Sequence, residues 1–423
     1  METFIRQHPL RDEILTEVHA RPYKAITTPR AVLQQAFLCK PSSSAEADMG
    51  AFWQWCISQN LPTPKTGSRH HTVLLGDIQI TWERHTEFIT LTWDCQYTKT
   101  AQMKLWQLSA QHTKTMMADQ HSLISAARVN LVAGTNTNKT PDLSEFNSDS
   151  ICMSQVKSDR ALIITDFMQD EFGATKYSVH NRGLDERNCG ILVRRLLEIE
   201  TYRMMSLYGF ECIKIILPQI AAVETQLVHL MEQVNTKSDI NTTRKTLDEI
   251  TDIAAELAKL SASSQYRFSA TRAYYSLVTA RLKRINEQGI PSFSKIEEFL
   301  NKRLAPAMRT VENVEQRIAI AGDKLDRSTG LLRTKVEMQM QVQNKEVLDS
   351  MNERALMQYR LQSTVEGLSI AAVSYYIVGL LNYVAKGIGI DGYINPKLLT
   401  AIFVPIAILS VWFIVRRIRS KHK

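Results

Sequence analysis

The spacing of hydrophobic and polar residues changes twice along the chain. Up to about residue 190 the pattern is mixed and rich in turn-forming residues. Residues 78–82 alternate apolar with polar side chains and residues 88–93 form a β-branched and aromatic run, which predicts two strands joined at 83–87. The apolar run 161–167 predicts a third strand. We therefore expect a mixed α/β domain of the α+β class over residues 1–190.

Beyond residue 190 the pattern becomes almost wholly helical. Residues 191–217 predict one helix, which Pro218 bounds or kinks, and residues 240–288 place apolar side chains at steps of three and four. These patterns predict a helical bundle or a coiled-coil-like stalk over residues 191–366.

Three shorter patterns add detail. Residues 99–130 are predicted to be helical, and the polar residues 135–150 are predicted to form a loop or linker. Ser294 and Glu297 have the spacing of a capping box, which predicts that a helix begins there.

The helix expected from about Leu331 has no obvious terminator before the apolar residues near the C-terminus. Along it, Val336, Met340, Val347 and Met351 have coiled-coil-like spacing. We expect this helix to continue directly into a membrane.

Two uncharged runs, residues 367–385 and 398–415, approach the length of helix that crosses about 30 Å of hydrocarbon. A short link joins them, so the sequence predicts a hairpin of two transmembrane helices over residues 367–415. Each run is slightly short, and a helix buried in a protein core is the alternative. Aromatic residues near the ends of the runs and small residues in the first run favour the membrane.

The second run ends in residues suited to a membrane interface, namely Trp412, Arg416, Arg417 and Arg419. Five Lys or Arg residues follow this run in the tail 416–423, whereas the link has two. We therefore predict a multi-pass protein of the bacterial inner membrane whose N- and C-termini are both cytoplasmic.

The formal charge of +8 and the isoelectric point near 9.1 would also suit a nucleic-acid-binding protein. Part of the positive excess lies in the tail, however, and no nucleic-acid-binding module accompanies it. We expect the lipid bilayer as a partner and no nucleic acid. The six cysteines are scattered, which predicts free thiols in a reducing compartment, and residues 1–22 lack the apolar run of a signal peptide.

The search for chemistry in the sequence is mostly negative. It contains no phosphate-binding GxxxxGK[ST] loop, no GxGxxG after a predicted strand, no HExxH and no GxSxG motif. The sequence therefore predicts no enzyme, no catalytic residue, no cofactor and no resident metal.

Two polar clusters are candidates for a ligand site or for a structural role. Glu17, His19 and Arg21 lie in a charged segment that could bind an anion, or could form a salt-bridged helix with Glu17 paired to Arg21. Arg84 and His85 lie at the predicted strand turn, where a structural hydrogen-bonding network is favoured over acid-base catalysis.

Four stretches of the sequence carry a resemblance to a known family. They are HPLRDEILTEVHARP at 8–22, ERHTEF at 83–88, LLEIETYRM at 196–204 and LQSTVEGLSIAAVSYYIVGLLNYVAKG at 361–387. With these stretches the chain resembles the bacterial family catalogued as domain of unknown function 3422. The resemblance covers nearly the whole chain and implies a membrane protein, and it leaves the activity open.

The expected architecture is also similar to that of the CorA class of divalent-cation channels. That resemblance implies a homo-oligomer in which the first span lines a pore, and a divalent cation as a possible partner. The Gly-Met-Asn signature of that class is missing from the link between the two runs. If the chain forms a ring, Asp391 could attract cations, and Ser374 and Asn382 could line the passage or simply pack helices.

Two classes of function follow from the sequence. One is a homo-oligomeric, CorA-like channel or transporter for cations. The other is a membrane-anchored scaffold or sensor whose cytoplasmic domain binds a protein or a small ligand.

Overall fold

The computed structural model describes residues 8, 11, 24–40, 45–134, 141–236, 240–388 and 396–421. Contacts divide the chain into two compact units. We call residues 1–233 with 248–327 the sheet unit, and residues 234–247 with 328–423 the C-terminal unit.

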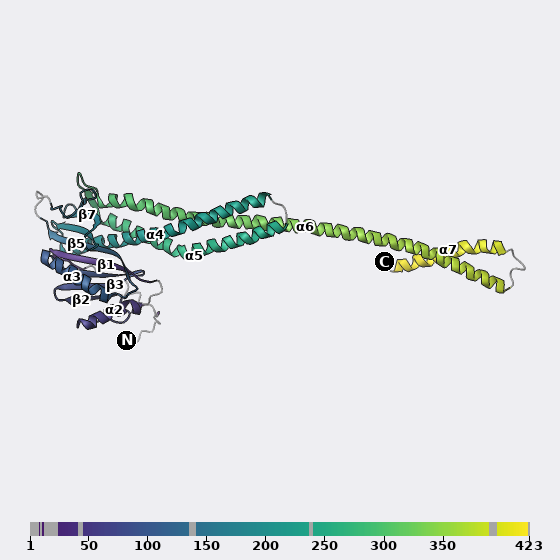
Figure 1. The fold of residues 1–423 in the computed structure, drawn as a ribbon, viewed down its shortest axis with the longest axis horizontal. Helices are drawn as coiled ribbons and strands as arrows, with labels where there is room; N and C mark the ends of the chain where they lie inside the picture. The colour runs from purple at the N-terminus through teal and green to yellow at the C-terminus, as the bar shows by residue number, and fades with distance from the viewer. Residues whose placement is uncertain are drawn as a thin grey trace. The chain divides into compact units, whose positions relative to one another are not determined.

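The sheet unit is built on a mixed sheet that contains nine strands among the described residues (Figure 1). Its strand order is β2-β3-β4-β1-β5-β8-β7-β6-β9, and neighbouring strands are antiparallel except for the parallel pair β5 and β8. The strands are β1 (Arg30–Leu38), β2 (His70–Leu75), β3 (Ile78–Arg84), β4 (Phe88–Gln96), β5 (Ser122–Ala133), β6 (Cys152–Val156), β7 (Ala161–Gln169), β8 (Thr175–Asn181) and β9 (Glu287–Gly289).

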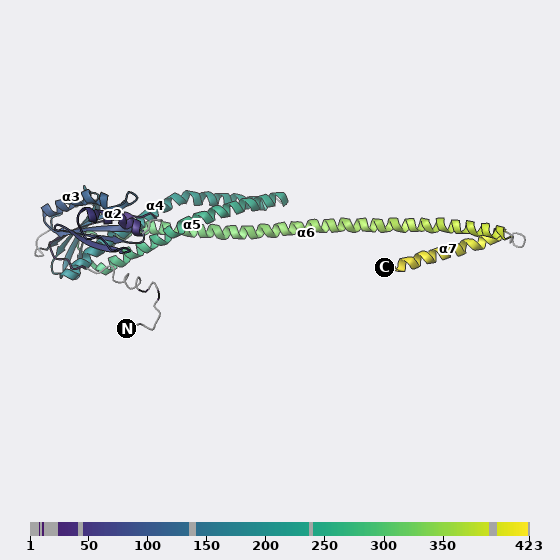
Figure 2. The same cartoon turned by 90° about the horizontal axis from the view of Figure 1, so that it is seen from below.

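Helices cover both faces of this sheet. The helices α2 (Ala45–Ser58) and α3 (Lys99–Met116) lie over one face (Figure 2). Residues of α4 (Glu186–Thr236), α5 (Ile240–Ile285) and α6 (Ile296–Gly387) pack against the other. Along β1, Ala31 and Leu33 belong to the core under α2 and α3, whereas Val32 belongs to the core under α4, because successive strand residues point to opposite faces.

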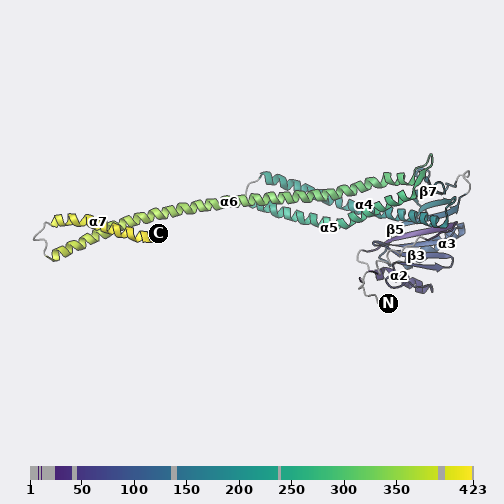
Figure 3. The same cartoon turned by 180° about the vertical axis from the view of Figure 1, so that it is seen from behind.

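Within the sheet unit, α4, α5 and the first part of α6 run side by side (Figure 3). Their buried residues pack along the bundle, and α4 and α5 approach closely at Gly209, where an added Cβ would lie 1.7 Å from Thr271 Oγ1. On the surface of the bundle Arg317 of α6 donates two hydrogen bonds to Glu224 of α4, at 3.0 and 2.6 Å.

The α+β class and the long helices predicted from sequence are confirmed, and so are the strands predicted at 78–82, 88–93 and 161–167. The helix predicted over 99–130 is wrong beyond Met116, since residues 122–133 alternate in burial as the strand β5. Pro218 does not end a helix, because α4 is continuous through it.

A helix does begin where the sequence predicts it, at Ile296, but its cap is not the predicted pair of Ser294 and Glu297. The backbone N–H groups of Ile296 and Glu297 donate to the carboxylate of Glu287, at 3.1 and 2.6 Å. A negatively charged side chain there stabilises the positive end of the helix dipole. The cap thus comes from β9, a strand that periodicity does not reveal because it has only three residues.

The C-terminal unit contains the rest of α6 and the helix α7 (Pro396–Lys421). The helix α6 is continuous from Ile296 to Gly387, so the helix expected from Leu331 does run without a break into the first uncharged run. All views place α7 beside the last part of α6, and Thr400 Oγ1 and Asn382 Oδ1 lie 3.3 Å apart in a hydrogen bond between the two helices.

Three helices of the described chain are long and apolar enough to cross a membrane: α4 within residues 186–233, α6, and residues 400–417 of α7. In α6 and α7 the large apolar side chains of the uncharged runs are mostly exposed, for example Tyr375 at 78% and Leu409 at 62%. In α4, by contrast, Leu196 and Ile199 are fully buried in the core against the sheet.

Candidate functional site

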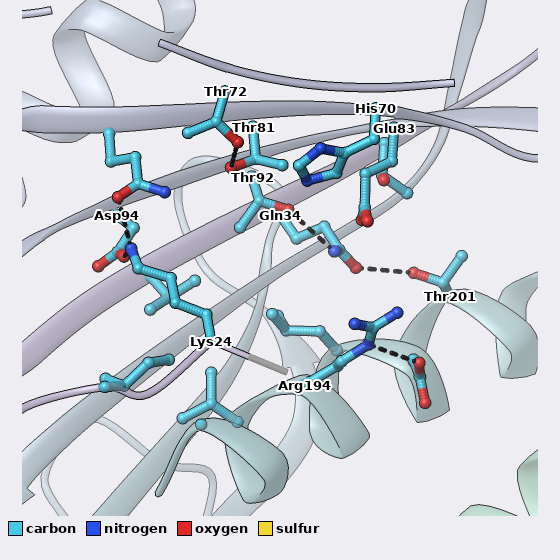
Figure 4. Close-up of a pocket in the computed structure, with 18 of the residues that line it drawn as sticks. Lys24, Gln34, His70, Thr72, Thr81, Glu83, Thr92, Asp94, Arg194 and Thr201 are labelled. Carbon is cyan, nitrogen blue, oxygen red and sulfur yellow. Dashed lines mark hydrogen bonds and ion pairs between the residues drawn. The ribbon is translucent and has the colours of Figure 1, made fainter. Parts of the chain in front are cut away.

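A cleft of about 380 Å³ lies between the sheet and α4 (Figure 4). Its floor is one face of β2, β3, β4 and β1, the four strands at one end of the sheet. In β3 the residues Gln79, Thr81 and Glu83 face the cleft, while the intervening Ile78, Ile80 and Trp82 are buried on the opposite face under α2 and α3. A strand with one polar and one apolar side produces this division by its two-residue period.

The neighbouring strands extend the same floor. In β4 the cleft residues Phe88, Thr90, Thr92 and Asp94 alternate with buried apolar residues. Thr92 lies opposite Thr81 in the pairing of β4 with β3. Backbone register therefore sets hydroxyl groups side by side at regular intervals along the cleft.

One wall of the cleft is the first part of α4, which approaches the segment before β1 very closely. A Cβ on Gly190 would lie 1.8 Å from the backbone oxygen of Lys24, so only glycine permits this approach. The backbone N–H of Ile26 donates to the oxygen of Glu186 at 2.9 Å. Through these contacts the Lys24 side chain reaches the cleft floor.

Charged groups of the cleft occur in pairs. Lys24 Nζ lies 2.5 Å from Asp94 and donates to Gln79 at 2.7 Å, and Arg30 also pairs with Asp94. On the α4 side, Arg194 Nε lies 3.0 Å from Glu198, which Arg281 of α5 also contacts. Asp94 and Glu198 thus each hold two cations, and Glu83 adds a third carboxylate to the lining, so positive and negative groups nearly balance at the cleft.

Uncharged hydrogen-bonding groups connect the floor to the wall. Gln34 of β1 donates to Thr92 Oγ1 at 3.0 Å and accepts from Thr201 Oγ1 of α4 at 3.3 Å (Figure 4). Beside this bridge, the Thr90 hydroxyl is buried and has no hydrogen-bond partner within the described part of the chain. A buried polar group without a partner is costly, and a ligand group in the cleft would offset that cost.

Arg84 and His85, the two residues that the sequence singled out at the turn between β3 and β4, lie on different sides of the sheet. Arg84 Nε lies 2.8 Å from Asp48 of α2, on the opposite side of the sheet from the cleft. His85 stacks on Phe88, with ring centroids 4.3 Å apart, and lines the cleft.

The nearby Glu87 fixes the turn against α5. Its carboxylate lies 2.7 Å from Arg267, whose guanidinium stacks over the Tyr208 ring at 5.0 Å. Burial first, and then the Glu87 carboxylate, raise the pKa of Tyr274. These contacts join the turn to α5.

The other residues proposed from sequence lie apart from the cleft. Glu17, His19, Arg21 and Asp391 fall outside the described residues. Ser374 and Asn382 line a space between α6 and α7.

At the far end of α7, the Arg416 guanidinium lies 4.9 Å from the centre of the Trp412 ring. Arg417 and Arg419 follow on the same helix, and the Arg419 side chain is outside what the structure describes. Trp412 and the arginines that the sequence predicts at a membrane interface thus lie together at one end of α7.

Sequence reasoning missed most of the cleft, including Lys24, Gln34, Asp94, Arg194 and Thr201. One signal was available. The polar positions of the alternating strands at 78–82 and 88–93 are threonine and glutamine, and these residues lie on the floor of the cleft.

The comparison with known families gives one match. A family described as a protein of unknown function (DUF3422) matches residues 6–422. The chain belongs to this family. No curated protein and no solved structure matches the chain, so the similarity to CorA channels finds no support. Membership of DUF3422 assigns no activity to the chain.

Proposed function

We propose that this DUF3422 protein is a membrane-anchored sensor whose sheet unit binds a small polar ligand in the cleft. The observation that carries the proposal is the cleft itself, a hollow of ligand size with a polar floor, paired charges and aromatic residues at one end. Pockets of this kind are the usual sites of small-molecule binding.

The anchor in this proposal is a hairpin formed by the last part of α6 and by α7. Their exposed apolar side chains would be covered by lipid, and the Asn382–Thr400 hydrogen bond would satisfy polar groups inside the bilayer. The helix α4 is not part of the anchor, because the buried Glu200 on it is tied to the sheet. By the positive charge after α7, the sheet unit lies in the cytoplasm of a bacterial cell.

The anchor is tested by placing a charge in the first span. Val373→Arg puts a guanidinium in the uncharged run at a position that is 47% exposed, and an arginine at a span centre costs about 2.5–3.5 kcal/mol. We expect less of this variant in the membrane fraction, whereas Leu356→Arg, upstream of the run, should partition like the wild type. Equal partitioning of all three chains would refute the anchor.

The chemistry of the lining limits the ligand. Paired charges favour a neutral or zwitterionic molecule over a strong anion, since an anion would have to displace a carboxylate from Lys24 or Arg194. The row of threonine hydroxyls suits a ligand with several hydrogen-bonding groups. Phe88 and Tyr202, whose ring centroids lie 6.4 Å apart, offer an apolar surface for its other side.

Binding in the cleft would act on the helices through Glu198. This carboxylate contacts Arg194 beside the cleft and Arg281 on α5, so a ligand that moves Arg194 changes the contact between α4 and α5. The bundle that these helices form includes the start of α6, and α6 is also the first membrane helix in this proposal.

The ligand site is tested by thermal shift on the full chain in nanodiscs, using a panel of neutral and zwitterionic amino acids and sugars. Gln34→Leu removes the link between Thr92 and Thr201 and should abolish the shift caused by any binding compound. Gln54→Leu changes an exposed glutamine of α2 and is the matched control. The site would be refuted if no compound of the panel raised the unfolding temperature of the wild type more than that of Gln34→Leu.

A homo-oligomeric cation channel is the second candidate. It is favoured by a long row of exposed apolar residues on α6 before the first span, including Met338, Val342, Val347 and Met351. A coiled coil with other copies of the chain would cover such a row. In a ring of copies, Asp391 would supply the carboxylates that attract a divalent cation.

Subunit counting in nanodiscs separates the two candidates, because a pore with one lining helix per subunit cannot form from a monomer. If the chain is oligomeric, cation flux into liposomes should fall in Asp391→Ala and should be retained in Asp326→Ala, an acidic residue of α6 in the sheet unit. Absence of flux in the wild type would refute the channel.

A further inference from the structure

Three side chains with metal-binding atoms meet on the side of the sheet opposite the cleft. Cys39 directly follows β1, Asp48 lies on α2, and His121 directly precedes β5. Their ligand atoms, a sulfur, a carboxylate oxygen and a ring nitrogen, all lie within 4.8 Å of one another. No pattern in the sequence brings these three together, because 73 residues separate Asp48 from His121.

The carboxylate of Asp48 is the centre of the group. Its Oδ1 lies 2.9 Å from His121 Nε2, and its Oδ2 lies 2.8 Å from Arg84 Nε. The side chains of Asp48 and His121 are both 0% exposed, whereas Cys39 is half-buried. The site is thus enclosed on two sides and reaches the surface through the cysteine.

The imidazole of His121 is incompletely satisfied. Its Nδ1 is buried and has no hydrogen-bond partner among the residues that the structure describes. Leaving such an atom unpaired costs about 1–3 kcal/mol. The ring nitrogen that faces Asp48 is Nε2, so a cation ligated by both side chains would replace the Nε2–Oδ1 contact, and Nδ1 would then carry the ring proton.

We propose that Cys39, Asp48 and His121 bind a zinc-class divalent cation. One thiolate, one imidazole and one carboxylate form a ligand set that suits Zn²⁺, and three protein ligands leave a fourth position for water. Bond lengths of about 2.0–2.3 Å require ligand atoms roughly 3–4 Å apart, so the group has to contract only slightly.

The neighbouring Arg84 is compatible with the cation. Arg84 holds Oδ2 of Asp48, so the oxygen that would ligate the cation is Oδ1, which contacts His121 Nε2 in this structure. A hydrogen bond to the second oxygen orients a ligating carboxylate. Without metal, burial and then the Asp48 carboxylate raise the pKa of Cys39 to about 12, so the sulfur carries a proton. When the cation binds, the S–H bond breaks, a metal–sulfur bond forms, and the proton leaves to solvent.

The bound cation would join α2 to the two strands β1 and β5, and so stabilise the apolar core on that side of the sheet. Trp55 of α2 and Trp82 of β3 are buried in this core, and tryptophan fluorescence therefore reports its unfolding. Of the six tryptophans, only Trp412 lies outside the sheet unit.

The test uses the full chain in detergent, stripped with a chelator and titrated with Zn²⁺ or Co²⁺. We expect one Zn²⁺ per chain by mass spectrometry of the metal, and a sulfur-to-cobalt charge-transfer band with Co²⁺. Cys39→Ser should lose the band and His121→Ala should weaken it. Cys212→Ser, which removes a half-buried cysteine of α4, should keep it.

A second measurement needs no variant. Zn²⁺ should protect Cys39, but not Cys212, from alkylation detected by peptide mass spectrometry, and should raise the unfolding temperature of the wild type. A band that persists in Cys39→Ser, or equal alkylation of Cys39 with and without Zn²⁺, would overturn the proposal.

Discussion

Replacing Glu200 by alanine should destabilise the sheet unit strongly. Glu200 lies on α4, is 1% exposed, and accepts hydrogen bonds from Thr175 Oγ1 at 2.9 Å and Tyr177 OH at 3.0 Å. It also pairs with Arg203, whose side chain is only 14% exposed. The variant leaves this guanidinium and two hydroxyl groups without their common acceptor.

The magnitude follows from burial. Removing one partner of a buried ion pair costs about 3–5 kcal/mol, because the remaining charge stays out of water. At a slope of about 1–3 kcal/mol per molar of urea, the midpoint of unfolding should fall by roughly 1–5 M. Tryptophan fluorescence is the assay, since all tryptophans except Trp412 lie in the sheet unit.

Two variants sharpen the result. Glu211→Ala removes a carboxylate from the same helix, but Glu211 is 64% exposed and pairs with Lys214 at the surface, so its loss should cost less than about 1 kcal/mol. The double variant Glu200→Leu with Arg203→Met removes both buried charges and should recover much of the stability. If Glu200→Ala unfolds at the same urea concentration as Glu211→Ala, the reasoning is refuted.

Two more predictions concern the helical bundle. Gly209→Ala puts a methyl group 1.7 Å from Thr271 Oγ1 and should lower the unfolding temperature. Gly322 has open space around it, so Gly322→Ala should raise the unfolding temperature slightly. A Gly209→Ala variant more stable than the wild type would contradict the close packing. A hydrogen bond from Arg317 holds the pKa of Glu224 below its usual value of 4.5. The pair therefore contributes its full stabilisation at pH values above 4.5. That contribution is lost as the pH falls through the lowered pKa, because the carboxylate is then protonated. The urea midpoint of Arg317→Ala should therefore fall less between neutral and acidic pH than that of the wild type, and an equal fall would count against the pair.

The sequence determined the local elements where hydrophobic periodicity is strong. Alternation at 78–82 and 88–93 gave β3 and β4, and the uninterrupted helical pattern after residue 331 gave the last part of α6. The two uncharged runs were also visible, since length and composition alone decide whether a helix could cross a membrane. These features depend on residues close together in the chain.

Elements with weak local patterns were decided by tertiary contacts. The central strand β1 carries Gln34 and Gln35 in its middle, which hides the alternation, yet it pairs along its whole length with β4 and β5. The short β9 forms only because the loop after α5 returns to the edge of the sheet beside β6.

Both sites depend on contacts between distant residues. Lys24 meets Asp94 across 70 residues because Gly190 lets α4 approach the chain before β1. Cys39, Asp48 and His121 meet because α2 packs over the ends of β1 and β5. Hydrophobic periodicity describes only residues close together in the chain, so it can show which positions of a strand are polar. It cannot show which of these positions meet in a cleft or in a set of metal ligands, because that depends on how distant segments pack.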